Sequence, residues 1–131
     1  MDFQLIPFDV AQHYETVSSW WRAHGQTPVP AELLPRVGYW VPGICAGFLY
    51  QTDSKLALVE NIVSAPDSPR DLRRSALNAV LDALCEQARC RGFKVVCGFS
   101  EKVPAVKLAL RNKFVEADGS FTLLTRSCEW R

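Results

Sequence analysis

The chain has 131 residues, of which 48% are hydrophobic and 22% are charged, and its formal net charge is +1. This length predicts one domain that is large enough to bury a core, and the composition is ordinary for a globular protein. A net charge near zero argues against a nucleic-acid-binding domain, which needs a broad basic surface, and gives no electrostatic reason for binding an acidic membrane.

Cellular location is predicted from apolar runs and cysteines. No apolar run reaches the length of a membrane span, and the N-terminus lacks the pattern of a signal peptide. The five cysteines form no Cys-x-x-Cys pair, and only two histidines accompany them, at no recognised metal-ligand spacing. We therefore expect reduced thiols, no metal site, no membrane partner and a cytoplasmic protein.

The first part of the chain predicts a strand, a helix and a short helical turn. Residues 3–7 are typical of a strand at or near a sheet edge, because the run ends in a proline that has no N–H to donate. Asp9 then caps a helix that ends near Gly25, with Gln12 completing a capping box. A helical turn is expected at residues 31–34.

Three strands in succession predict an antiparallel meander. They lie at Val37–Val41, at residues 44–51 and at Leu56–Ser64, and the turn Pro42-Gly43 separates the first two. Residues 52–54 form the second turn. Connections this short join neighbouring antiparallel strands.

A long amphipathic helix is predicted from Pro69 to about Arg91, and Gly92 ends it. Ser68 is the expected N-cap, Pro69 fits the first helical position, and Asp71 completes a capping box. Apolar residues recur at helical spacing and form one stripe: Leu72, Ala76, Leu77, Val80, Leu81, Leu84 and Ala88.

Arginines crowd the first turns of this helix. Arg70, Arg73 and Arg74 lie there with Ser75, close to free backbone N–H groups and the positive end of the helix dipole. Such a place suits a phosphate group. The alternative is an ordinary solvated helix end, and the sequence does not decide between the two.

The remaining chain predicts a parallel crossover and a closing hairpin. A strand at residues 93–99 follows the long helix, as in a strand–helix–strand unit. A second amphipathic helix is expected at residues 103–113. Short strands at 114–116 and 121–125 flank a turn at 118–120. The whole order predicts a mixed α/β layer with a mostly antiparallel sheet.

This order of elements resembles the GNAT family of N-acetyltransferases over nearly all of the chain. The local marks are the strand end at 59–66, the arginine-rich start of the long helix, the stop at Gly92, and the helix at 103–113 running into Phe114. The resemblance implies the GNAT-like acyl-CoA N-acyltransferase fold, with helices on both faces of the sheet. It also implies that acetyl-CoA, as co-substrate, lies between the fourth and fifth strands, with its pyrophosphate at the start of the long helix.

The chain departs from the family pattern in ways that bear on activity. The family's pyrophosphate loop contains glycines, which let backbone N–H groups approach the phosphates, but residues 70–76 contain none. Either arginine side chains replace those contacts, or coenzyme A binding is weakened or lost. The family's frequent proton-donating tyrosine would fall near Ala109 or Leu110, and the usual glycine before the closing Phe114 is Lys113.

Glu60 is the candidate general base for amine acetylation, because a carboxyl group within an apolar strand has a raised pKa. The alternative is that Glu60 is hydrogen-bonded or salt-bridged within the fold. The resemblance implies that Ile62 and Val63 offer backbone hydrogen bonds to the pantetheine arm. Ser100 and Cys97 are candidates for protonating the thiolate, with a structural role as the alternative.

Three aromatic residues, Tyr39, Trp40 and Tyr50, are candidates for lining an acceptor cleft, although strand aromatics usually pack in a core.

Two functions remain open. The first is an acyl-CoA-dependent N-acetyltransferase acting on a small amine or a protein amine, as a monomer or homodimer. The second is a catalytically inactive GNAT-fold binding protein, in a phage or mobile-element setting. The glycine-free loop and the missing tyrosine favour the second, whereas Glu60 and the arginines favour the first.

Overall fold

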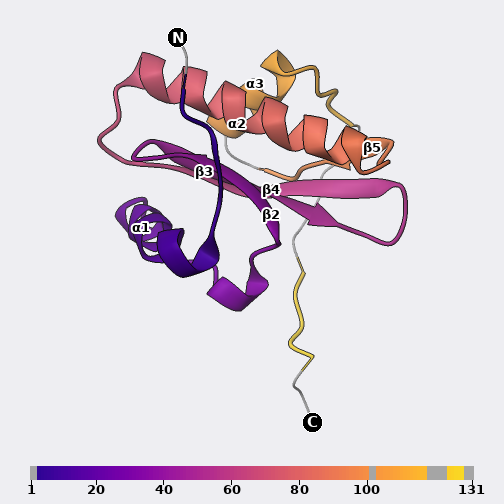
Figure 1. Cartoon of the computed structure of the whole chain (residues 1–131), viewed down its shortest axis with the longest axis horizontal. Coiled ribbons are helices and arrows are strands. Elements are labelled where there is room, and N and C mark those ends of the chain that lie inside the picture. The colour runs from indigo at the N-terminus through magenta and orange to yellow at the C-terminus, as the bar shows by residue number, and fades with distance from the viewer. Residues whose placement is uncertain (1–2, 101–102, 118–123, 129–131) are drawn as a thin grey trace.

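A computed structural model of the chain describes residues 3–100, 103–117 and 124–128. One five-stranded sheet has the strand order β1-β2-β3-β4-β5, antiparallel except between β4 and β5. Helix α2 lies across one face and α1 against the other, which confirms the mixed, mostly antiparallel fold (Figure 1). The elements are β1 Ile6–Pro7, α1 Val10–Ala23, a 3-10 turn Ala31–Leu33, β2 Val37–Val41, β3 Cys45–Gln51, β4 Leu56–Ser64, α2 Arg70–Cys90, β5 Val95–Cys97 and α3 Val103–Arg111.

The central strands β2 and β4 begin and end where the sequence predicts, whereas the outer strands are shorter. β1 pairs only Ile6 and Pro7 with β2, and β5 pairs only three residues with β4. β1 still ends at Pro7 but lacks residues 3–5 at its N-terminal end, and β5 is shorter at both ends because its ladder with β4 spans only Val95 to Cys97.

The start of α1 confirms the predicted cap but not its partner. The Asp9 carboxylate accepts a hydrogen bond from the backbone N–H of Ala11 at 2.9 Å. The backbone N–H of Asp9 donates to Nδ1 of His13 at 2.9 Å, so the capping box with Gln12 is wrong. The His13 ring also stacks on Trp40, with ring centroids 4.0 Å apart.

The start of α2 differs from the prediction by one residue. Pro69 is the N-cap, with φ −58° and ψ 141°, and it has no side-chain cap bond. The prediction that Ser68 caps α2 is therefore wrong, because the Ser68 hydroxyl donates to the carbonyl of Ala65 at 2.9 Å and closes the preceding turn. The helix stop is confirmed, since Gly92 follows α2 with φ +89°.

The two faces of the sheet pack against different classes of hydrophobic side chain. The α2 face is mainly aliphatic, and the α1 face is mainly aromatic. Burying both faces supplies the main stabilising term of such a domain. Buried residues on the α2 side include Val37, Leu49, Val59, Val80 and Leu84, and those on the α1 side include Phe8, Trp20, Trp21, Trp40, Phe48 and Val63.

The closing hairpin is not formed by the residues that the structure describes. Residues 114–116, predicted as a strand, are irregular: Phe114 packs against the aliphatic core, but Val115 is 91% exposed. Leu124 and Thr125 are also outside any strand, and residues 124–128 run away from the sheet (Figure 1). The predicted turn at 118–120 and residues 121–123 lie outside the described residues. Among the described helices, none combines the length and apolar character needed to cross a membrane.

Candidate functional site

A β-bulge divides β4 into two halves. Between the paired positions of Glu60 and Val63, β4 has two residues, whereas β3 covers the same interval with Gly47 alone. The extra residue lies at Asn61, whose φ is +61°. Asparagine is one of the few residues besides glycine that adopts this left-handed conformation readily. Bulges of this kind bend a strand and redirect its side chains, and they are common beside functional sites.

The parallel ladder between β4 and β5 ends just before this bulge. The last pair is Leu58 with Cys97, and a side-chain hydrogen bond also joins the two segments beyond it. Oε1 of Glu60 accepts a hydrogen bond from the backbone N–H of Phe99 at 2.9 Å. A carboxylate therefore holds the chain after β5 against β4 where main-chain pairing has stopped.

Glu60 is half-buried, and its environment perturbs its acidity. Burial raises the pKa of the Glu60 carboxyl, and the hydrogen bond from Phe99 partly opposes this shift. The raised pKa agrees with the predicted requirement for a base, and the hydrogen bond agrees with the structural alternative. Oε2 of Glu60 has no hydrogen-bond partner within the described part of the chain, so one oxygen is available for proton transfer.

Asn61 and Tyr50 lie beside Glu60. Nδ2 of Asn61 donates to the Tyr50 hydroxyl at 2.8 Å, and this hydroxyl donates to the backbone carbonyl of Leu33 at 2.9 Å. Burial raises the pKa of Tyr50, and the Glu60 charge adds to this effect, while the Asn61 bond opposes it. Of the three aromatic candidates for an acceptor cleft, Tyr50 is the one that interacts with Glu60.

The other two aromatic candidates pack in the cores. Trp40 is 8% exposed and belongs to the aromatic cluster on the α1 side of the sheet. Tyr39 is partly buried and packs on the α2 side. Ser100, the predicted thiolate acid, is exposed after the end of β5.

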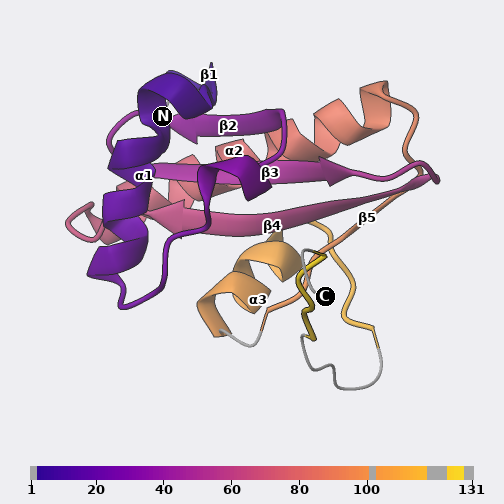
Figure 2. The same cartoon turned by 90° about the horizontal axis from the view of Figure 1, so that it is seen from below.

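A cleft of about 530 Å³ lies between the bulged half of β4, the first turns of α2, and α3. In Figure 2, α3 lies beside β4. Residues of β4, α2 and α3 all line the cleft. The lining residues are His24, Gln26, Ile62, Val63, Ser64, Arg70, Arg73, Arg74, Leu77, Pro104, Ala105, Lys107, Leu108 and Arg111.

The charge of this cleft is strongly positive. Arg70, Arg73, Arg74, Lys107 and Arg111 line it, and no Asp or Glu is among the described lining residues. Within the described residues, no acidic side chain pairs with any of these five cations. In the described part of the chain, the hydrogen bond of these five side chains is a weak one, from Nη1 of Arg73 to the Ser68 carbonyl at 3.4 Å.

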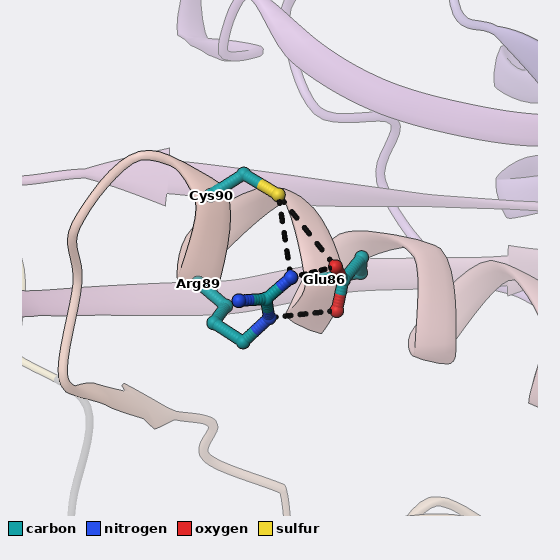
Figure 3. Close-up of polar contacts among 3 residues, drawn as sticks. All are labelled: Glu86, Arg89 and Cys90. Carbon is teal, nitrogen blue, oxygen red and sulfur yellow. Dashed lines mark hydrogen bonds and ion pairs between the residues drawn. The ribbon is translucent and has the colours of Figure 1, made fainter.

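The opposite end of α2 shows how the same residue type behaves when it is paired. Arg89 forms a two-point ion pair with Glu86, and Cys90 donates to the same carboxylate with Sγ 3.6 Å from Oε1 (Figure 3). The hydrogen bond from Arg89 lowers the pKa of Glu86. The arginines at the start of α2 have no such partner among the described residues, so their charge remains available to a bound anion.

The structure brings together most of the predicted cofactor residues. Ile62 and Val63 line the cleft along with the three arginines of α2. Ser75 is half-buried and does not line it, and Glu60 and Ser100 lie outside the lining as well.

Sequence reasoning missed Lys107 and Arg111 as members of this cleft. Their spacing of four residues on a predicted helix places them on one helix face, which was the available signal. The sequence did not show that this face turns toward α2. Leu108, at 4% exposure, and Nδ2 of Asn112, bonded to Oδ1 of Asn78 at 3.0 Å, fix α3 in that orientation.

A second cavity, of about 580 Å³, lies between α1 and the loop that leads into α2. Asp67 is its only charged lining residue within the described part of the chain, so it lacks the cations of the first cleft. In the described residues, no group of three or more His, Cys, Asp or Glu side chains is placed to hold a metal ion.

No protein-family model matches the chain, and no curated protein matches it. Several solved structures share its fold. An acetyltransferase from Trypanosoma brucei superposes with a TM-score of 0.65 at 12% identity, covering 95% of this chain and 100% of that chain. An aminoglycoside acetyltransferase from an uncultured soil metagenomic sample, in complex with sisomicin, gives a TM-score of 0.63 at 13% identity, covering 95% and 97%. A protein from Thermus thermophilus gives 0.61 at 18% identity, covering 98% and 99%. The chain has the fold of these proteins, which confirms the predicted GNAT-like architecture.

Proposed function

We propose that this chain is an acyl-CoA-dependent N-acetyltransferase that takes acetyl-CoA as co-substrate and a small amine or a protein amine as acceptor. The observation that carries the proposal is the cationic cleft, which joins the first turns of α2 to the bulged end of β4. Solved acetyltransferases with the same fold support it.

Arg70, Arg73 and Arg74 would hold the pyrophosphate of acetyl-CoA. Guanidinium groups match phosphate oxygens in geometry and charge, and the free N–H groups of the first turn of α2 add to the attraction. Ile62 and Val63 form the floor of the cleft, where their backbone groups would bond the pantetheine arm. A role for Ser75 stays a prediction, because its side chain does not line the cleft.

Glu60 would accept the proton that the amine loses as its nitrogen attacks the thioester carbonyl. The C–N bond forms, the C–S bond breaks, and coenzyme A leaves as a thiolate that must regain a proton. A raised pKa suits a general base near neutral pH, and Oε2 is available for the transfer. Ser100 stays the predicted proton donor to the thiolate.

The alternative function, a catalytically inactive binding protein of the same fold, has its own support. Residues 70–76 contain no glycine, and α3 has Ala109 and Leu110 where a proton-donating tyrosine is frequent in the family. This alternative keeps the cleft as a binding site and removes the turnover.

Calorimetric titration with acetyl-CoA tests the cleft. We expect Arg73→Ala with Arg74→Ala to weaken binding by about tenfold or more, because two charge-assisted contacts to phosphate are lost. Arg36→Ala, on the exposed loop before β2, removes one positive charge elsewhere and should leave the affinity unchanged. No binding by the wild type at millimolar acetyl-CoA would contradict the proposal.

A turnover assay separates the two functions. Wild-type protein that binds acetyl-CoA is offered panels of small amines and lysine peptides, and free thiol is measured over time. Thiol release above the rate without protein supports the transferase. Tight binding without release for any amine supports the inactive binding protein.

A further inference from the structure

The cleft carries more positive charge than a pyrophosphate on the first turn of α2 requires. Arg70, Arg73 and Arg74 form one wall, and they lie where such a pyrophosphate would sit. Lys107 and Arg111 form a second wall, on a different helix. The two groups are separate in the chain and meet only through the packing of α3 against α2.

The position of the second wall is fixed by the fold. Leu108, between the two cations in sequence, is buried in the core shared with α2. Nδ2 of Asn112 bonds Oδ1 of Asn78 on α2 at 3.0 Å and the carbonyl of Leu108 at 2.9 Å. Lys107 and Arg111, one helical turn apart, are therefore held at the cleft, while their side chains stay exposed enough to adjust to a ligand.

The five cations of the cleft repel one another, and no acidic side chain among the described residues offsets this repulsion. Arg70 with Arg74 and Lys107 with Arg111 are like-charge pairs at a spacing of four residues, which is unfavourable on a helix. No described Asp or Glu neutralises them. A ligand that neutralises both walls must carry a second anionic group besides its pyrophosphate.

We propose that Lys107 and Arg111 bind the 3′-phosphate on the ribose of coenzyme A, so that the cleft selects the 3′-phosphorylated form of its ligand. A phosphate monoester carries a charge of about −2 near pH 7 and has three acceptor oxygens, which two neighbouring cations can satisfy. This inference rests on the proposed function for the presence of a coenzyme A ligand. It holds for an active transferase and for an inactive binding protein alike.

The test compares coenzyme A with dephospho-coenzyme A, which lacks only the 3′-phosphate. Dissociation constants are measured by calorimetry for the wild type and for Lys107→Ala with Arg111→Ala. We expect the wild type to bind coenzyme A about tenfold more tightly, in line with two exposed charge-assisted contacts. In the double variant this preference should fall below about twofold, with affinity for dephospho-coenzyme A nearly unchanged.

Arg73→Ala with Arg74→Ala is the matched control, since it removes the same number of cations from the other wall. It should weaken both ligands equally and keep their ratio. Thermal unfolding of each free variant shows that the fold is intact.

Equal affinity of the wild type for the two ligands would overturn the inference and leave the proposed function standing. Equal weakening of both ligands by Lys107→Ala with Arg111→Ala would also overturn it, because the pair would then serve the shared part of the ligand. If the wild type binds neither ligand, the proposed function and this inference are both contradicted.

Discussion

The two halves of β4 differ although they belong to one strand. Ala57 and Leu58 are paired on both sides, with β3 and with β5. From Glu60 onward β4 keeps only β3, contains the bulge at Asn61, and forms the floor of the cationic cleft. The first half fixes the sheet, and the second half has no strand partner on the side toward β5 among the described residues.

This difference teaches how one strand can provide both stability and access. A ladder with neighbours on both sides satisfies the backbone groups of the first half inside the fold. The second half lacks that ladder on one side, and a side chain, Glu60, replaces part of it by bonding Phe99. Three changes at or beside the junction test this division of roles.

Gly47→Ala should have the largest effect. A Cβ at this position would lie 3.0 Å from Cγ1 of Val80 and 3.1 Å from Cδ1 of Leu84, so these side chains must give way by a few tenths of an ångström. We expect a loss of about 1–3 kcal/mol in the free energy of unfolding, as for other overpacked cores. Urea denaturation measures it.

The control for Gly47→Ala is its combination with Val80→Ala, which removes the nearest obstructing atom. The double variant should lose less than the sum of the two single losses, because the sites are in contact. Strict additivity would show that crowding beneath the bulge is not the cause.

Asn61→Ala should have the next largest effect. It removes the 2.8 Å bond to Tyr50 and places an alanine at φ +61°, and together these cost about 1–2 kcal/mol. Asn61→Gly also loses the hydrogen bond but adopts this φ without strain. We therefore expect Asn61→Gly to be the more stable variant in chemical denaturation. The reverse order would contradict the account of the bulge.

Glu60→Gln should have the smallest effect, visible mainly as a pH dependence. The pKa of Glu60 lies above its ordinary value of 4.5 in the folded chain, so the folded state holds this proton more tightly than the unfolded state. The resulting stability is full below the ordinary pKa and is lost as the pH rises through the raised one. Glutamine does not titrate and can still accept from Phe99.

The measurement for Glu60→Gln is the urea midpoint at a series of pH values that begins below the ordinary pKa of 4.5 and rises to neutral pH. The variant should gain stability relative to the wild type as the pH rises, and the gain should then level off. Glu15→Gln, on α1, is the matched control for removing an exposed carboxylate. A constant difference for Glu60→Gln would contradict the raised pKa.

Much of the fold could be predicted because its signals are local. The bounds of β2 and β4 follow from apolar runs between turn residues, and α2 follows from a long apolar stripe. The cap at Ser68 was wrong because the conformation of Pro69 decides where the helix begins, and nothing local fixes its ψ. The outer strands were predicted too long, because pairing depends on a neighbour that the sequence does not place.

The candidate site could be predicted only in part, for the same reason. The arginines at the start of α2 are recognisable from their position on a helix, and Glu60 from its apolar surroundings. Lys107 and Arg111 could not be predicted without the orientation of α3. That orientation depends on the tertiary contacts of Leu108 and Asn112. Asn61 carried a faint signal, since asparagine tolerates a positive φ, but many asparagines never use it.

The bulge also sets which way the end of β4 faces. Val59 lies in the core beneath α2, and Val63, an even number of positions later, lies in the core against α1. In a regular strand these two side chains would share one side. If Asn61 were instead accommodated in a regular strand without the bulge, Ile62 and Val63 would turn to the opposite sides, whereas deletion of Asn61 would leave both on the sides that they now occupy. A single additional residue thus decides which side chains of the last segment reach each core.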